Sequence, residues 1–233
     1  MILRQNVHYS SLLINKFTLY IILLLLKLVL ILHYNSITMT ANIPIEYHPL
    51  EPFLPDGARV LMLGSFPPKR ERWSMEFFYP NRQNDMWRIV GLLFFGDKTH
   101  FEIVGERRFD RERIVDFCAH QGIALYDTAT AVKRLKDNAS DKFLEVVTPT
   151  DVVALLARIP LCQAIVTTGQ RATDLIVEQF GCASPAIGSY TTLELPCGQV
   201  RFWRMPSTSR AYPLALDKKA IRYRHFFTTE QLL

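Results

Sequence analysis

The sequence predicts a single α/β domain with three layers, in which helices cover both faces of a mainly parallel central sheet. Short apolar runs of strand length alternate along the chain with longer segments whose apolar residues recur every three or four positions. Strands that alternate with helices in this way are typical of a parallel sheet. The 233 residues are enough for one domain with a sizeable core.

The first half of the predicted domain begins with a proline-rich, aperiodic segment, residues 40–57, which predicts an extended lead-in. An apolar run predicts a strand over residues 58–65. Helices are predicted over residues 84–95 and 108–121, and each is followed by a glycine that favours a helix stop.

The second half continues the alternation of strands and helices. A threonine before Pro-x-Asp, in Thr148-Pro-Thr-Asp151, is a helix start signal. A turn at Pro196-Cys-Gly198 predicts a hairpin between two strands. The predicted elements are a strand at 123–126, a helix from 148–151 to about 158, a strand at 164–167, a helix at 169–180, hairpin strands at 191–195 and 200–204, and a helix at 213–227.

Residues 1–38 differ in composition from the rest of the chain. They contain no Asp or Glu, and the apolar run Phe17–Leu32 is about as long as a bilayer-spanning helix, although Lys27 interrupts it. A membrane anchor, a signal peptide and a start codon assigned too early are three possible interpretations. Residues 34–38 are a poor signal-cleavage site, and Met39 begins a segment that resembles an ordinary soluble N-terminus. We therefore favour the third interpretation, and expect the domain to span residues 39–233, to be cytoplasmic and not to bind a membrane.

The overall charge is a weak argument for a nucleic-acid partner. The formal net charge is +5, and it falls to +2 without the three cations of residues 1–38. The distribution of the basic residues is more informative, because they gather beside two loops and on the last helix. These residues are Lys69, Arg70, Arg72, Arg82, Arg201, Arg204, Arg210, Lys218, Lys219, Arg222 and Arg224. For the last helix, a solvated face is an equal alternative.

Two neighbouring motifs carry most of the functional signal. The apolar run Val60–Leu63 ends in Gly64-Ser-Phe-Pro67, and Asn84-Asp-Met-Trp87 opens the next helix. The loop between them is rich in arginine and aromatic residues. Open α/β sheets bind their ligands where parallel strands end, and amides, aromatic faces and arginines are suited to holding a base and its phosphates.

Together with a third motif, Met205-Pro-Ser-Thr-Ser-Arg-Ala-Tyr212, these two motifs resemble the uracil-DNA glycosylase superfamily, and most closely its hypoxanthine-DNA (deoxyinosine) glycosylase branch. The resemblance runs from about Leu54 to Phe227. It implies a monofunctional DNA glycosylase that flips a deaminated base out of the helix and hydrolyses its glycosidic bond, with hypoxanthine first and uracil second. It also implies DNA containing a damaged base as the partner, no cofactor or metal, and a monomer.

Some superfamily relatives bind an iron–sulfur cluster through four cysteines. The four cysteines of this chain, at positions 118, 162, 182 and 197, lack the close C-x-x-C type of spacing that such a cluster favours. We expect neither a cluster nor disulfides.

The resemblance assigns catalysis to Asn84, whose amide carbonyl can orient a water without titrating. The alternative is that Asn84 only caps the helix. Asp127, at the end of the second strand, can accept the N–H of a keto base, or it can be an ordinary capping residue. Phe78 and Tyr79 are candidates to stack on the flipped base, with core packing as the alternative for the phenylalanine.

The remaining predicted site residues lie in the first and third motifs. Ser65 and Phe66 are predicted to line the base pocket, and Arg70 to bind DNA. Ser207, Thr208 and Ser209 are predicted to hold phosphates, and Arg210, or Tyr212 in its place, to fill the gap left in the base stack. An ordinary turn is the alternative for these serines and the threonine. Arg134 and Asn138-Ala-Ser-Asp141 resemble a further family block, in which a glycine is replaced by Asn138.

The chain departs from the family in one respect that bears on function. Other branches carry a catalytic Asp or Asn directly in the first motif, where this chain offers only the Ser65 hydroxyl. A nucleic-acid-binding protein of the same fold without catalytic activity is therefore the alternative function. A nucleotide-binding α/β protein is disfavoured, because the sequence contains neither G-x-G-x-x-G nor a P-loop.

Overall fold

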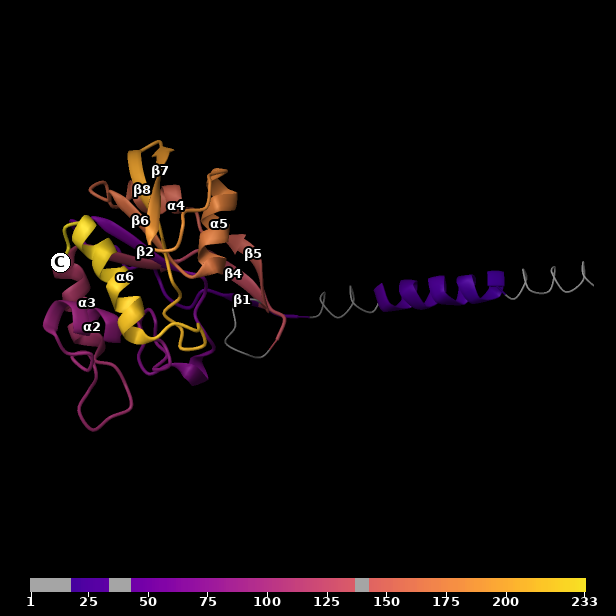
Figure 1. The fold of residues 1–233 in the computed structure, drawn as a ribbon, viewed down its shortest axis with the longest axis horizontal. Helices are drawn as coiled ribbons and strands as arrows, with labels where there is room; N and C mark the ends of the chain where they lie inside the picture. Colours follow the sequence, from indigo (N-terminus) through magenta and orange to yellow (C-terminus); the bar gives the residue numbers. More distant parts are fainter. Residues whose placement is uncertain (1–17, 34–42, 137–142) are drawn as a thin grey trace, which may run out of the picture. The chain divides into compact units, whose positions relative to one another are not determined.

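The computed structural model describes residues 18–33, 43–136 and 143–233. Residues 18–33 form a helix whose side chains are exposed. Among the residues described, no helix is both long and apolar enough to span a lipid bilayer. The elements labelled in Figure 1 all belong to one compact unit, Ile45–Leu233.

The central sheet has five strands and is mainly parallel, as the sequence predicts. Its members are β2 (Val60–Gly64), β3 (Ile123–Asp127), β6 (Ala164–Thr168), β7 (Ser189–Leu195) and β8 (Gly198–Met205), in the order β3-β2-β6-β8-β7. Neighbouring strands are parallel except for the β7–β8 hairpin. The register places Gly64 opposite Asp127, and Thr168 opposite Met205. The ends of β2, β3, β6 and β8 therefore lie along one edge of the sheet.

A second, antiparallel sheet was not predicted. It consists of β1 (Ile45–Tyr47), β4 (Ala129–Arg134) and β5 (Leu144–Pro149), in the order β1-β4-β5. The lead-in segment is therefore part of the fold. The predicted helix start at Thr148-Pro149 was also wrong, because these residues end β5, and the cap is Asp151, whose Oδ1 accepts from the Ala154 amide at 2.9 Å.

The helices lie on both faces of the central sheet (Figure 1). α2 packs against α6, α3 packs against β3, and α5 packs against β6. All begin within three residues of their predicted starts, apart from α4. Their bounds are α2 Met86–Phe95, α3 Arg111–Gln121, α4 Val152–Ala157, α5 Gln170–Phe180 and α6 Leu216–Thr229, with a 3-10 turn η1 at Arg70–Arg72.

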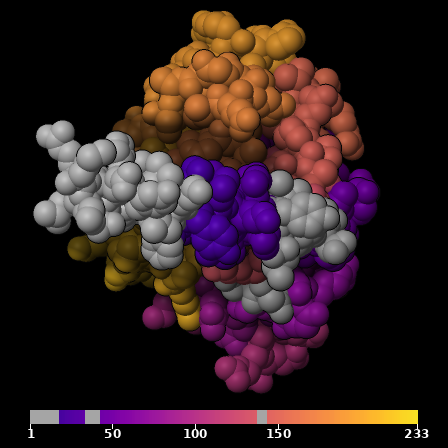
Figure 2. Space-filling view, turned by 90° about the vertical axis from the view of Figure 1, so that its right-hand side faces the viewer, coloured from indigo at the N-terminus to yellow at the C-terminus, as the bar shows by residue number. Residues whose placement is uncertain are grey.

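The core lies between the central sheet and its helices. Trp203 on β8 and Tyr223, Phe226 and Phe227 on α6 are almost completely buried. The Trp203 indole donates to the buried Glu230 carboxylate, which supplies the hydrogen-bond partner that a buried indole N–H requires. Segments distant in sequence, the orange β7–β8 region and the magenta residues near 100, form opposite ends of one face in Figure 2.

Candidate active site

The loops that follow β2, β3, β6 and β8 meet at the carboxyl edge of the sheet. The Thr128 amide donates to the Gly64 carbonyl at 2.9 Å, and the Gly169 amide donates to the Met205 carbonyl at 3.1 Å. These bonds join the starts of the loops in two pairs, β2 with β3 and β6 with β8, and β2 is itself paired with β6 in the sheet. Three of the loops carry residues that the sequence analysis singled out.

Asp127 and Tyr79 both approach the Cα of Gly64 from the side on which a Cβ would lie. A Cβ built on Gly64 would lie 2.3 Å from Asp127 Oδ1 and 3.8 Å from the Tyr79 hydroxyl. A contact of 2.3 Å is far inside van der Waals range, so a glycine is required here to admit the carboxylate.

Tyr79 has an uncommon backbone conformation, with φ of 51°. A bulky residue at positive φ is strained, and such strain is found most often at functional sites. The Tyr79 hydroxyl is hydrogen-bonded to Thr168 Oγ1 at 3.0 Å, which connects the first loop to the end of β6. Burial raises the pKa of Tyr79 well above its usual value, and the hydrogen bond with Thr168 opposes this only in part. The phenol therefore stays protonated.

Asp127 is paired with a histidine that the sequence analysis did not identify. His48 Nε2 lies 2.9 Å from Asp127 Oδ2, and the histidine side chain is only 2% exposed. The residue follows β1 directly, within the segment that was predicted to be a plain lead-in. Burial, together with the nearby Asp127 charge, raises the pKa of the adjacent Tyr126 to about 12.

Asn84 precedes Asp85, the N-cap residue of helix α2, and also joins the third motif. Its Oδ1 accepts from the Met86 amide at 2.9 Å. Asn84 forms an isolated β-bridge with Ser209, and the Asp85 amide donates to the Thr208 carbonyl at 2.8 Å. The second and third motifs, more than a hundred residues apart in sequence, are thus in direct backbone contact.

A buried ion pair lies beneath this junction. Lys219 of α6 is fully buried, and its ammonium donates to Asp85 Oδ2 at 3.1 Å and to the Ser209 carbonyl at 2.9 Å. Arg210 Nε donates to the other Asp85 oxygen at 2.9 Å. The solvated basic face allowed for the last helix is therefore wrong for Lys219. The Arg210 side chain is half exposed and is held by Asp85.

The two phenylalanines of the predicted base pocket are almost completely buried. Phe78 belongs to the main core, whereas Phe66 packs in a smaller cluster with Ala129 and Val132. Core packing, the alternative given for Phe78, is what the structure shows. Ser65 is also buried, next to Phe66.

Arg134 of the further family block and Arg70 of the first loop have different surroundings. The nearly buried Arg134 donates to the Glu46 carboxylate at 2.9 Å and to the Pro67 carbonyl at 3.1 Å, so it holds the first loop against β1 and β4. Arg70 is exposed, pairs with Glu76 at 2.6 Å and lies over the Trp73 ring. Asn138–Asp141 lies outside the described residues.

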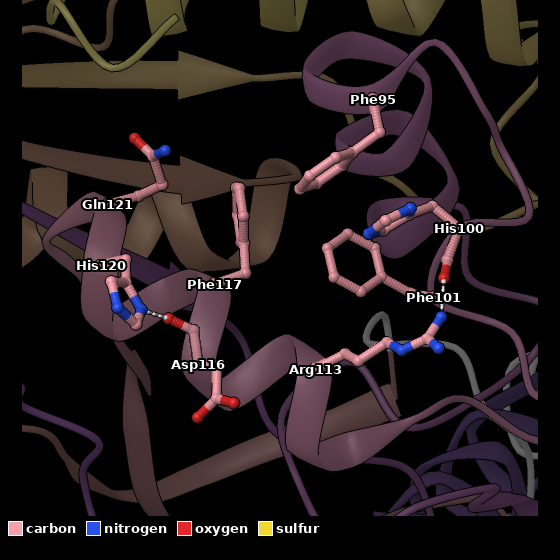
Figure 3. A pocket seen from close by; sticks show the side chains of 8 residues that line it. All are labelled: Phe95, His100, Phe101, Arg113, Asp116, Phe117, His120 and Gln121. Atoms are coloured by element: carbon pink, nitrogen blue, oxygen red, sulfur yellow. Dashed lines mark hydrogen bonds between the residues drawn. The ribbon is translucent and has the colours of Figure 1, made fainter.

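A hollow of about 440 Å³ lies between α2 and α3 and contains none of the predicted site residues (Figure 3). Stacked Phe95 and His100 form one wall, and Phe117 faces them. Gln121, another lining residue, precedes the start of β3, so this end of the hollow lies toward the opposite edge of the sheet. The hollow is therefore separate from the candidate site.

The close approach at Gly64 yields a prediction about stability. We expect Gly64→Ala to lower the free energy of unfolding by about 1–3 kcal/mol, the usual cost of overpacking, because the added methyl displaces the Asp127 carboxylate. In an Asp127→Ala background, the same substitution should cost much less. Urea unfolding of the four proteins measures this coupling. Equal costs in both backgrounds would contradict the proposed clash.

No protein-family model and no curated protein matches the sequence. Among solved structures, the chain is similar to the solution NMR structure of a protein from Methanosarcina acetivorans described as a candidate uracil DNA glycosylase. The two share 20% sequence identity with a TM-score of 0.52, and the match covers 78% of this chain and 98% of the other. At this identity the similarity shows a common fold, a mainly parallel sheet between two layers of helices.

Proposed function

We propose that this protein is a DNA glycosylase that flips a deaminated base out of the duplex and hydrolyses its N-glycosidic bond, with hypoxanthine preferred and uracil second. The observation that carries the proposal is a pair of contacts at one sheet edge: Asn84 is bridged to Ser209, and Asp127 Oδ1 and the Tyr79 hydroxyl both approach Gly64. The fold shared with the Methanosarcina acetivorans protein supports the general activity. The motif resemblance is what favours hypoxanthine.

The chemistry requires a placed water and stabilisation of a departing base. The sugar develops positive charge while the base develops negative charge, and both charges must be met by groups that are already in position. The Asn84 carbonyl oxygen has two lone pairs, and the Met86 amide uses one of them. The other can accept from the attacking water. The hydrogen bond from Met86 also immobilises the Asn84 side-chain amide, so that no reorganisation is needed during the reaction.

Recognition of the base is assigned to Asp127. Its Oδ1 can accept the N1–H of hypoxanthine or the N3–H of uracil. Adenine has a lone pair at the corresponding nitrogen, so an ionised carboxylate would repel it, and a site built around such a hydrogen bond discriminates strongly. The Tyr79 hydroxyl, which also approaches Gly64, is the second polar group available to the base. The Tyr79 ring is the candidate stacking surface.

Phosphate binding is assigned to Ser207, Thr208 and Ser209, and to the arginines Arg70 and Arg210. Affinity should therefore fall as salt rises, and Arg70→Ala and Arg210→Ala should each reduce the slope of log K against log salt by about one unit. Fluorescence anisotropy with a labelled duplex, from low to physiological salt, measures the slope. Arg158→Ala is the matched control, because this exposed arginine directly follows α4, before β6 begins, at the opposite edge of the sheet. Binding that does not depend on salt would contradict the assignment.

The alternative is a protein that binds DNA without excising a base. The first motif favours it, because Ser65 stands where other superfamily branches carry an acid or amide. The two functions predict the same salt-dependent binding, and only catalysis separates them.

Duplex oligonucleotides that carry inosine, deoxyuridine or deoxyxanthosine test the proposal directly. We expect strand cleavage at the lesion after alkali treatment, fastest for inosine, and no cleavage without alkali, as a monofunctional enzyme leaves an intact abasic strand. Binding to every duplex without cleavage of any would favour the alternative.

A further inference from the structure

His48 is a buried polar residue to which the proposed function assigns no role. It follows β1 and reaches the carboxyl edge of β3, where its Nε2 contacts Asp127 Oδ2 at 2.9 Å. The rings of Phe66, Phe78 and Tyr126 surround its imidazole, with centroid distances of 5.5, 6.2 and 4.6 Å. The histidine is therefore enclosed by aromatic rings and hydrogen-bonded to the carboxylate assigned to base recognition.

The contacts of the imidazole determine which way its proton points. Nδ1 lies 2.8 Å from the Leu50 carbonyl oxygen and 3.2 Å from the Leu50 amide nitrogen, so the backbone can either accept a proton from this nitrogen or donate one to it. In both arrangements an ionised Asp127 requires the hydrogen on Nε2, because a carboxylate can only accept. His48 therefore occupies one oxygen of the carboxylate, Oδ2, as a donor.

The second oxygen has a different environment. Oδ1 lies against Gly64, and a Cβ built on that glycine would be 2.3 Å from Oδ1 and 3.8 Å from the Tyr79 hydroxyl. With Oδ2 held by His48, the carboxylate cannot turn about its Cβ–Cγ bond without losing a buried hydrogen bond. Oδ1 is thus kept as an acceptor at a fixed position.

We propose that His48 is a positioning residue that determines base specificity: it fixes Asp127 so that Oδ1 accepts from a base carrying a ring N–H beside a carbonyl. This inference rests on the proposed function and assigns its substrate class, the keto bases produced by deamination. Without His48, the carboxylate is free to rotate, and the preference for an N–H should weaken.

The test compares two lesions that differ only at the recognised position, hypoxanthine and N1-methylhypoxanthine, in otherwise identical duplexes. Single-turnover excision by the full-length parent should favour hypoxanthine by at least about 10²-fold, because the methylated base leaves Oδ1 unpaired. His48→Leu should lower this ratio roughly 10- to 100-fold, the value of a hydrogen bond to a charged group, mainly by slowing excision of hypoxanthine. His48→Gln retains a side-chain N–H and should recover part of the ratio.

Thr150→Val is the matched control. Thr150 donates to the Asp127 backbone carbonyl at 2.7 Å and does not touch the carboxylate, so its loss should leave the ratio unchanged. A His48→Leu protein that excises both lesions more slowly by the same factor would show a merely structural role and overturn the inference.

The parent protein alone also tests the inference, whether or not the leucine variant folds. Equal excision of both lesions by the parent would mean that the protein does not recognise the N1–H of the base. This result would overturn the inference while the proposed function stands. If the parent excises no lesion of the oligonucleotide panel but binds them all, the proposed function itself fails, and the inference fails with it.

Discussion

Replacing Lys219 by methionine is expected to lower the free energy of unfolding by roughly 3 kcal/mol, the low end of the loss seen when one partner of a buried ion pair is removed. Methionine fills a similar volume but leaves Asp85, which is nearly buried, without its ammonium partner. The Ser209 carbonyl loses its donor as well. Arg210 still pairs with Asp85, which is why the low end of the range is expected.

Lys218→Met is the matched control for this substitution. Lys218 precedes Lys219 on the same helix, but its side chain is exposed, so the change should alter stability by no more than about 0.5 kcal/mol. Urea or thermal unfolding of both variants measures the difference. If the two variants were equally stable, the buried pair would not be holding the second and third motifs together.

Replacing Asn84 by alanine is expected to slow single-turnover excision by roughly 10²-fold or more, as occurs when a comparable positioned polar group is removed from an active site. DNA affinity should persist, because phosphate contacts supply most of it. Stability should fall by about 1 kcal/mol, because the amide of Met86, the first residue of α2, loses its hydrogen-bond acceptor. Asn84→Asp should retain this hydrogen bond and hence the stability.

Asn81 offers a matched control three residues earlier. Its Oδ1 accepts from the Gln83 amide at 2.8 Å, the same local bond as that between Asn84 and Met86. Asn81→Ala should therefore cost similar stability without slowing excision. If Asn84→Ala excised every lesion as fast as the parent, Asn84 would have only a structural role at the start of α2, and the catalytic group would have to be sought at Ser65 or Asp127.

The sequence was sufficient to predict the central sheet and its helices, because their patterns are local. The strands at 60–64, 123–127 and 164–168 are short apolar runs, and each of their residues is buried. The antiparallel sheet was not predicted, because the spacing of apolar residues in its strands is a weak signal. β1 is only three residues long, and in β5 only Leu144 is fully buried, so neither strand stands out from the surrounding loops.

The partners within the candidate site could not be predicted, since they depend on contacts between distant residues. His48 is a lone histidine in a proline-rich segment, 79 residues before Asp127. Lys219 did leave a signal, because it lies at helical spacing from the buried Tyr223 and Phe226 and therefore on the apolar face of α6. The Gly64 close approach likewise depends on the β2–β3 register, which the sequence does not specify.

The most direct test of the central claim is chemical identification of what the protein releases from a duplex containing inosine. The released material is separated from the DNA and identified by mass spectrometry, with the parent and Asn84→Ala compared in a single turnover. The proposed function predicts free hypoxanthine and an intact strand with one abasic site, formed at least about 10²-fold more slowly by the variant. If the parent releases no base from this duplex, or from duplexes containing uracil or xanthine, at a concentration that saturates binding, the protein is not a glycosylase for deaminated bases.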